Sequence, residues 1–155
     1  MHPAYELWGN ESVVATLRFR DLQRREALAA SANGIWMVSA SEREEGAVHF
    51  DSPGGSIAEY RLAPQGAGSL LLRGSRPLVW LRKSLWTSLF SFVDIAGNEF
   101  MRFEVAADRS GKTIVILSDA AVTDPDAALV AVAGHYLTLG TTPTKGAGPS
   151  ANYRT

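Results

Sequence analysis

The chain has 155 residues, no cysteine, and a net charge of −1 from 15 basic and 16 acidic side chains. This length fits one domain that can bury a core without a disulfide or a metal staple. The lack of cysteine excludes disulfides, thiolate metal sites and cysteine nucleophiles, and it suits a reducing compartment. The balanced charge gives no overall field that would attract nucleic acid, so we expect no nucleic-acid partner.

The first ten residues lack the basic start and apolar core of a signal peptide. No apolar run reaches the ~18 residues that would suggest a membrane-spanning helix. We therefore expect a soluble, cytoplasmic protein that does not span a membrane.

Short runs of alternating polar and apolar residues, separated by Gly and Pro turns, fill the chain to about position 112, a pattern typical of β-strands. Asn33-Gly34 predicts a hairpin. The Ala-rich segment Glu26 to Ser31 fits helix or strand, and we favour strand because its neighbours are strands. In Val13 to Arg20, we expect one side to carry Val13, Ala15, Leu17 and Phe19. The other expected strands are Ile35 to Ala40, Ala47 to Asp51, Ile57 to Leu62, Ser69 to Arg73, Leu78 to Lys83, Thr87 to Ile95, Glu99 to Val105 and Thr113 to Ser118.

The pattern changes near position 123. Thr123-Asp124-Pro125-Asp126 is a helix start signal, in which Thr123 or Asp124 caps free N–H groups and Pro125 takes the first helical position. From Ala127 to Leu139 the sequence has no charge and is apolar on every side, and Gly140 is the expected end. A helix of this kind must be buried all round. Its length of about 21 Å is too short for a bilayer and fits the interior of a small barrel.

The predicted fold is therefore mostly β (α+β): a closed antiparallel β-barrel of about ten to twelve strands around a central hydrophobic C-terminal helix, at about 125–139. One domain is expected at 1–140, followed by a disordered tail at 141–155.

Four local features in residues 78–140 resemble the tubby C-terminal-like superfamily, which includes the phospholipid scramblases and the LURP-one-related proteins. They are the Trp-centred strand Leu78 to Leu81, the turn in Phe92 to Glu99, the strand Phe100 to Phe103, and the end Asp126 to Gly140 with Gly134-His135-Tyr136-Leu137. The resemblance implies a closed twelve-strand barrel around one helix. It also implies phosphoinositide binding through basic residues, but no matching phosphate-site motif is present here.

Several motifs resemble functional sites, but we interpret each of them as structural. Residues 106–113 end in Gly-Lys-Thr like a P-loop, but they lack the first Gly and precede a β-branched run, so we expect a hairpin turn. Asp94 is expected to form a turn, and Glu42, Glu44 and Glu45 a solvated loop. No spacing of His and acidic residues completes a metal site, so no metal or cofactor is expected.

The three histidines give no catalytic constellation. His2 lies near the start, and His49 in a strand. His135 lies on the apolar helix, where we expect a neutral ring hydrogen-bonded to the backbone or to a strand side chain. No Gly-x-Ser-x-Gly elbow accompanies it, so we expect no enzyme.

Two basic clusters are candidate binding sites. Arg73, Arg76, Arg82 and Lys83 lie near Trp80 and Trp86 in the sequence and could bind anionic head groups. A second cluster, Arg18, Arg20, Arg24 and Arg25, is expected on an exposed strand face. Our leading hypothesis is a non-enzymatic binding or structural module, with an unidentified ligand or protein partner held on the outer wall or the rim loops, because the helix fills the barrel. The alternative is peripheral binding of anionic phospholipid or phosphoinositide through the first cluster.

Overall fold

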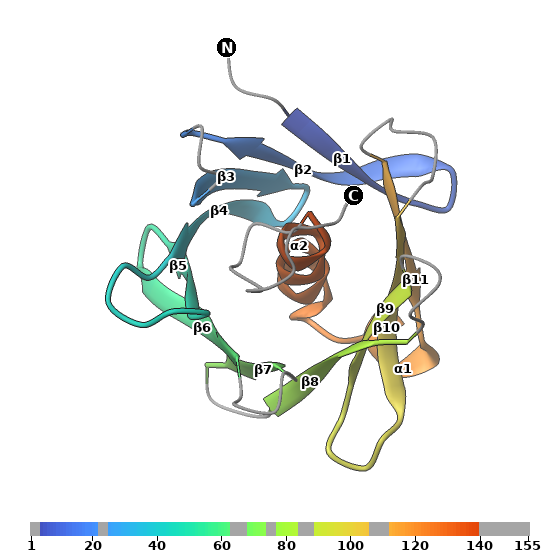
Figure 1. Cartoon of the computed structure of the whole chain (residues 1–155). Helices are drawn as coiled ribbons and strands as arrows, with labels where there is room; N and C mark the ends of the chain where they lie inside the picture. The colour runs from blue at the N-terminus through green and yellow to red at the C-terminus, as the bar shows by residue number, and fades with distance from the viewer. Residues whose placement is uncertain are drawn as a thin grey trace.

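The computed structural model describes residues 4–21, 25–62, 68–73, 77–83, 89–105 and 112–139. Within these ranges, eleven strands form one closed barrel, and helix α2 (Ala127–Thr138) lies inside it (Figure 1). The mostly-β barrel with a central helix is confirmed. The strands are β1 (Ala4–Gly9), β2 (Ser12–Phe19), β3 (Glu26–Ser31), β4 (Gly34–Ala40), β5 (Val48–Ser52), β6 (Gly55–Leu62), β7 (Gly68–Leu72), β8 (Pro77–Arg82), β9 (Leu89–Val93), β10 (Glu99–Val105) and β11 (Thr113–Leu117).

The barrel closes through one parallel pair of strands. Neighbours from β1 to β11 pair antiparallel in chain order. In such an order all odd-numbered strands run the same way, so eleven strands can close only if the first and last are parallel. In the parallel pair β1 and β11, Leu7 lies opposite Thr113 and Trp8 opposite Ile114. Closure leaves the described sheet without a free edge.

The alternation in the sequence sets which side chains face inward. The Ala-rich segment is strand β3, as favoured, and Asn33 lies in the turn between β3 and β4. Val13 is the exception, because it is exposed although it was expected to share the inward face of Ala15. A shift of register between Leu7 and Trp8 makes Val14 an extra residue in β2, so Val13 turns outward with Trp8.

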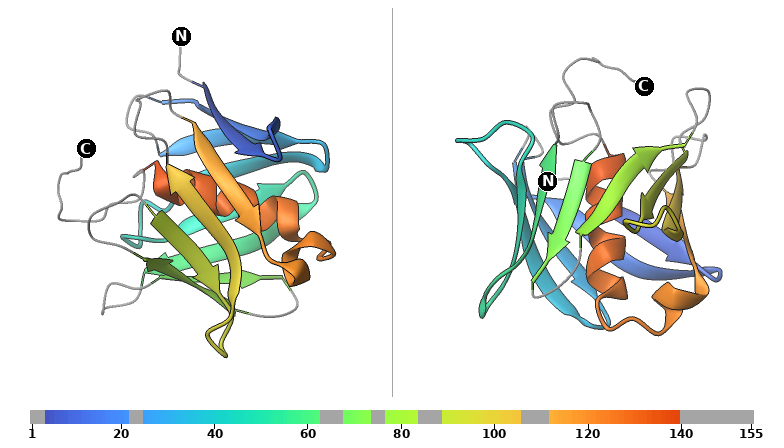
Figure 2. Two further views of the ribbon diagram at one scale, coloured as in Figure 1. Left: turned by 90° about the vertical axis from the view of Figure 1, so that its right-hand side faces the viewer. Right: turned by 90° about the horizontal axis from the view of Figure 1, so that it is seen from below.

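A short helix that the sequence did not indicate leads the chain into the barrel. Helix α1 (Asp119–Val122) follows β11, and the Ser118 hydroxyl caps it by accepting the Ala121 N–H at 3.2 Å. Helix α2 then runs along the barrel (Figure 2). We call the end of the barrel where α2 begins the entry end and the opposite end the exit end.

The start of α2 lies slightly later than predicted. Asp126 is the N-cap residue and Ala127 the first helical residue, so Pro125 precedes the helix. The predicted cap Asp124 acts one step earlier, because its Oδ1 accepts the Asp126 N–H at 2.8 Å and fixes the turn. The expected end at Gly140 and the expected tail at 141–155 lie outside the described residues.

Helix α2 lies closest to β2, β9 and β10. A Cβ on Gly134 would lie 2.1 Å from Cζ of Phe103, so only glycine permits this approach to β10. Phe103 in turn packs against Trp80 and Phe92, with ring centroids 5.5 Å and 6.1 Å away. Near the exit end, the Tyr136 hydroxyl donates to the Arg25 carbonyl at 3.2 Å. The buried residues of α2 are Leu129, Val130, Ala131, Val132, Ala133, Gly134, His135, Tyr136 and Leu137.

The substitution Val132→Asp tests the burial of α2. Val132 is fully buried, and an unpaired buried carboxylate costs several kcal/mol against a typical total stability of about 5–15 kcal/mol. We expect loss of the folded state by circular dichroism. The matched control is Val122→Asp in α1, where Val122 is 66% exposed. A folded Val132→Asp protein with unchanged stability would contradict burial of this face.

The substitution Gly134→Ala tests the contact between α2 and β10. Alanine favours the helix by about 1 kcal/mol, but its methyl group would overlap the Phe103 ring, and overpacking costs about 1–3 kcal/mol. We expect a net loss of about 1 kcal/mol in urea unfolding, and this loss should disappear when the same change is made in a Phe103→Leu background, measured against Phe103→Leu alone. If Gly134→Ala alone stabilised the protein, the close approach would be wrong.

Candidate functional site

The predicted basic patch is divided between the two ends of the barrel. Arg73 directly follows β7 at the entry end, whereas Arg82 is the last residue of β8 and Lys83 follows it at the exit end. At about 3.3 Å per residue, strand β8 separates the two groups by roughly 17 Å. Arg76 lies outside the described residues. Arg73 therefore cannot share one compact binding surface with Arg82 and Lys83.

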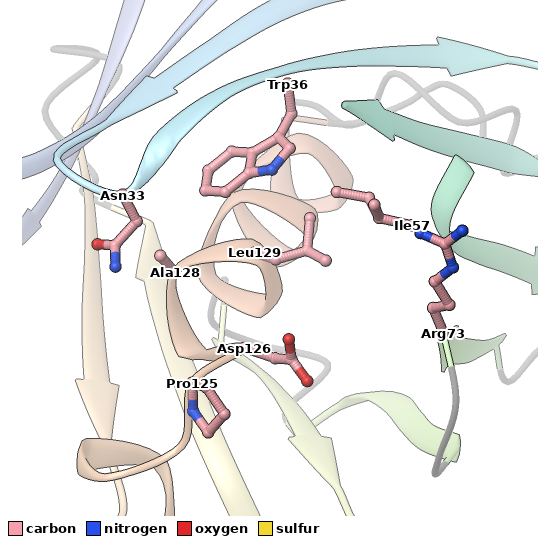
Figure 3. Close-up of a pocket in the computed structure, with 8 residues that line it drawn as sticks. All are labelled: Asn33, Trp36, Ile57, Arg73, Pro125, Asp126, Ala128 and Leu129. Carbon is pink, nitrogen blue, oxygen red and sulfur yellow. The ribbon is translucent and has the colours of Figure 1, made fainter. Parts of the chain in front are cut away.

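A pocket of about 350 Å³ opens at the entry end, between the first turn of α2 and the strands facing it (Figure 3). Helix α2 packs against the opposite side of the barrel, on β2, β9 and β10. We call this hollow the rim pocket. It is lined by Asn33, Trp36, Ile57, Arg73, Pro125, Asp126, Ala128 and Leu129.

The rim pocket combines apolar side chains with two oppositely charged ones. The side chains of Trp36, Ile57 and Leu129 face the hollow, and the carboxylate of Asp126 points into it (Figure 3). The Arg73 backbone is held by its N–H donating to the Ile57 carbonyl at 3.0 Å. Among the described residues, the Arg73 and Asp126 side chains form no ion pair with each other, and Asp126 makes no side-chain cap bond to α2. Both charges are thus available to a ligand.

The exit-end pair engages its own barrel wall. The Arg82 guanidinium lies 5.7 Å from the ring centroid of Phe90, and Phe90 stacks on Trp80 at 5.3 Å with an interplanar angle of 6°. Trp80 packs against the core of the barrel. The Lys83 N–H donates to the Leu89 carbonyl at 2.8 Å. The predicted neighbour Trp86 lies outside the described residues.

A carboxylate, Glu99, interacts with side chains of β9 and β10 on the outer surface. The hydrogen bond from Arg102 is the largest cause that lowers the pKa of Glu99, and the hydroxyl of Ser91 and the charges of Arg102 and Lys83 act in the same direction. Glu99 accepts from both Ser91 and Arg102. Lys83 thus already has a nearby anionic group on its own chain.

The other acidic motifs have structural roles. Asp94 Oδ1 accepts the N–H groups of Ala96 and Asn98 at 2.9 Å each, which makes it the turn former that the sequence predicted. These bonds, with that from Asn98 the largest cause, lower the pKa of Asp94. Glu44, in the exposed loop before β5, pairs with Arg61. In the part of the chain that the structure describes, no group of three or more His, Asp or Glu side chains could hold a metal ion.

The segment after Lys112 does not fit a P-loop. Thr113 begins strand β11, which pairs antiparallel with β10, so no phosphate-binding helix follows Lys112. The connection itself, residues 106–111, lies outside the described residues. Thr113 faces inward beside Leu7, and its buried hydroxyl has no hydrogen-bond partner among the described residues.

His135 is sealed in the core, and our expectation of a hydrogen-bonded ring is wrong. The residue has no exposed surface, and neither ring nitrogen has a partner among the described residues. Burial lowers the pKa of His135 to about 3, because the charged ring would lose its hydration. The neutral ring is thus the stable form. His49 lies half-buried in β5, on the outward side, and His2 lies outside the described residues.

The described members of the second basic cluster lie around the end of β2 and the start of β3, but they differ in exposure and contacts. Arg18 is exposed on the outer face of β2, and Arg20 follows the strand. The Arg25 guanidinium donates to the Ser41 carbonyl at 3.1 Å, which ties the start of β3 to the loop after β4. Arg24 lies outside the described residues. The expected exposed strand face therefore holds for Arg18.

Sequence reasoning singled out Arg73 but missed Trp36, Ile57 and Asp126 as parts of a pocket. Trp36 lies on β4 and Ile57 on β6, and the two come together because both strands pair with β5. Asp126 was read solely as a helix-start residue. The one local signal was an acidic residue at the mouth of a buried helix, near hairpin turns at the same end. Among the described residues, the structure also contains no helix of the length and hydrophobicity needed to cross a membrane.

The buried His135 ring predicts acid sensitivity. Its pKa is about 3 in the folded state against about 6.5 when unfolded. With respect to this ring, the free energy of unfolding therefore has its full value above pH 6.5 and falls as the pH drops toward 3. One proton corresponds to about 1.4 kcal/mol per pH unit. We expect a loss of about 2 kcal/mol in the free energy of unfolding between pH 6.5 and pH 5.

Urea titrations at several pH values measure this slope. His135→Leu should remove most of it. His49→Gln should retain the wild-type slope, because that change leaves the buried ring in place. An unaltered slope in His135→Leu would show that another group causes the acid sensitivity.

Comparison of the chain with protein-family models, curated proteins and solved structures finds no match.

Proposed function

We propose that this chain is a non-enzymatic binding module that holds a small amphipathic ligand in the rim pocket. One observation carries the proposal: Arg73 and Asp126, which form no ion pair with a described residue, line a hollow whose other lining side chains are mostly apolar. Binding sites for small molecules typically combine an apolar lining with a few convergent polar groups. At about 350 Å³, the pocket suits a ligand near the lower end of the usual size range.

The lining favours a ligand with a ring or branched apolar body and a zwitterionic end. Trp36 and Leu129 can pack against the apolar body. Arg73 can receive a carboxylate through two parallel hydrogen bonds, and Asp126 can accept from an ammonium group. Because the two charges are opposite, a ligand that carries only one charge would leave the other without compensation.

The same geometry supports binding rather than catalysis. His135 is sealed away from the pocket and from solvent. Apart from the charged groups of Arg73 and Asp126, the polar side-chain groups among the described lining residues are the amide of Asn33 and the indole N–H of Trp36, and these residues include no Ser, Thr, His or Lys. A nucleophile paired with a general base would need such groups within hydrogen-bond reach of each other.

The family resemblance and a cytoplasmic location are part of the same proposal. The closed barrel around a helix supports the resemblance to the tubby C-terminal-like superfamily, although the described strands number eleven rather than twelve. The cysteine-free composition supports a cytoplasmic location.

Binding of phenylalanine and its one-charge analogues tests this function. We expect saturable binding of L-phenylalanine by calorimetry or by amide shifts in NMR, and weaker binding of phenylacetate and phenethylamine. Arg73→Gln should weaken phenylalanine and phenylacetate binding by about tenfold, because it removes a charge-assisted hydrogen bond. Asp126→Asn should weaken phenylalanine and phenethylamine binding.

Arg82→Gln is the matched control, because Arg82 lies at the exit end and should not affect these affinities. No saturable binding of any of the three probes, or equal loss in Arg73→Gln and Arg82→Gln, would contradict the rim pocket as the site. Sedimentation with vesicles of anionic phospholipid tests the alternative. Capture that depends on Arg82 and Lys83 and is lost in high salt would favour lipid binding at the exit end instead.

A further inference from the structure

The outer surface of β3 and β4 is an uncovered apolar block. Four side chains alternate with inward residues and face away from the helix. They form two cross-strand pairs, Leu28 with Met37 and Ala30 with Ile35. Leu28 is 40% exposed and Ile35 is 56% exposed. No other helix or strand of the described residues lies over this surface in Figure 1 or Figure 2. We call these four residues the β3–β4 face.

The β3–β4 face carries opposite charges on its two sides. The strand register places Arg18 of β2 directly beside Leu28, and Asp51 of β5 directly beside Met37. One row across four strands thus reads basic, apolar, apolar, acidic. With strands about 4.8 Å apart, Arg18 and Asp51 are separated by roughly 14 Å. They cannot pair within one chain, and neither forms an ion pair with another described residue.

We propose that the β3–β4 face binds the same face of a second copy of this chain, with the twofold axis parallel to the strands. Such an axis, placed above the line between β3 and β4, brings Arg18 of each copy opposite Asp51 of the other. It also stacks Leu28 on Met37 across the interface. Twofold interfaces are isologous, so a surface must complement itself, and this row does so.

The charge pattern selects this arrangement over the other twofold. An axis perpendicular to the strands would place Arg18 opposite Arg18, and Asp51 opposite Asp51, which like-charge repulsion disfavours. The chosen axis makes the strands of the two copies run in nearly the same direction, as in aligned packing of two sheets. Stacked sheets lie about 10 Å apart, a gap that one long arginine and one short aspartate side chain can bridge together.

This interface is separate from the proposed ligand site. The rim pocket lies inside the barrel wall, and the β3–β4 face lies outside it. Dimer formation can therefore fail while ligand binding persists, and the reverse also holds.

A charge exchange in the full chain tests the proposal, with the molecular mass measured by sedimentation velocity from micromolar to near-millimolar protein. We expect wild type to reach the mass of two 16.7 kDa chains. Arg18→Asp and Asp51→Arg should each raise the dimer dissociation constant by about tenfold or more. The double variant should restore dimerisation, because the row is reversed but still self-complementary.

A matched pair of apolar substitutions locates the interface. Ile35→Glu should dissociate the dimer, whereas Leu71→Glu should not, because Leu71 is similarly exposed, at 54%, but lies on β7. A monomeric wild type over the whole range would overturn the proposal. So would a double charge variant no better than the single ones, or equal dissociation by Ile35→Glu and Leu71→Glu.

Discussion

The structure depends on one constraint: helix α2 is apolar on every side and must be surrounded. An amphipathic helix could lie on one face of a sheet, but a helix without a polar side cannot. The eleven strands satisfy this by closing around it. Gly134 lies against the Phe103 ring, where the missing Cβ lets helix and strand touch. Large aromatic side chains, including Trp80 and Phe92, then fill the rest of that side.

The same constraint explains the tolerance for unpaired polar groups in the core. His135 and Thr113 are buried with polar atoms that have no partner among the described residues. Each such group costs roughly 1–3 kcal/mol. The barrel can bear this because the surrounding apolar burial is extensive, but for His135 the cost increases further in acid. Acid thus lowers the stability of the whole barrel through His135, a group that solvent does not reach in the folded state.

The fold could be predicted from the sequence because its two signals are local. Alternation marks the strands, and an uncharged stretch of helical length marks α2. The predictions that were wrong or incomplete depended on how separate strands pair and pack, which local sequence does not specify. The bulge that turns Val13 outward depends on how β1 pairs with β2. The division of the basic patch depends on the direction of β8, because nine positions separate Arg73 from Arg82 but a whole strand lies between them. The hydrogen-bonding state of His135 depends on which side chains from distant strands reach it.

The position of the pocket also follows from the central helix. Because α2 packs closest to β2, β9 and β10, the hollow opens on the side of β4, β6 and β7. At its mouth stands Asp126, an ideal residue type for capping a helix, yet its carboxylate caps nothing. A capping bond is worth about 1 kcal/mol, so the helix forgoes stabilisation at the point where the carboxylate faces the hollow. Sites that serve binding commonly retain such a loss of stability. Under the proposed function, Asp126 is explained by the ligand that its carboxylate would meet and not by the helix it begins.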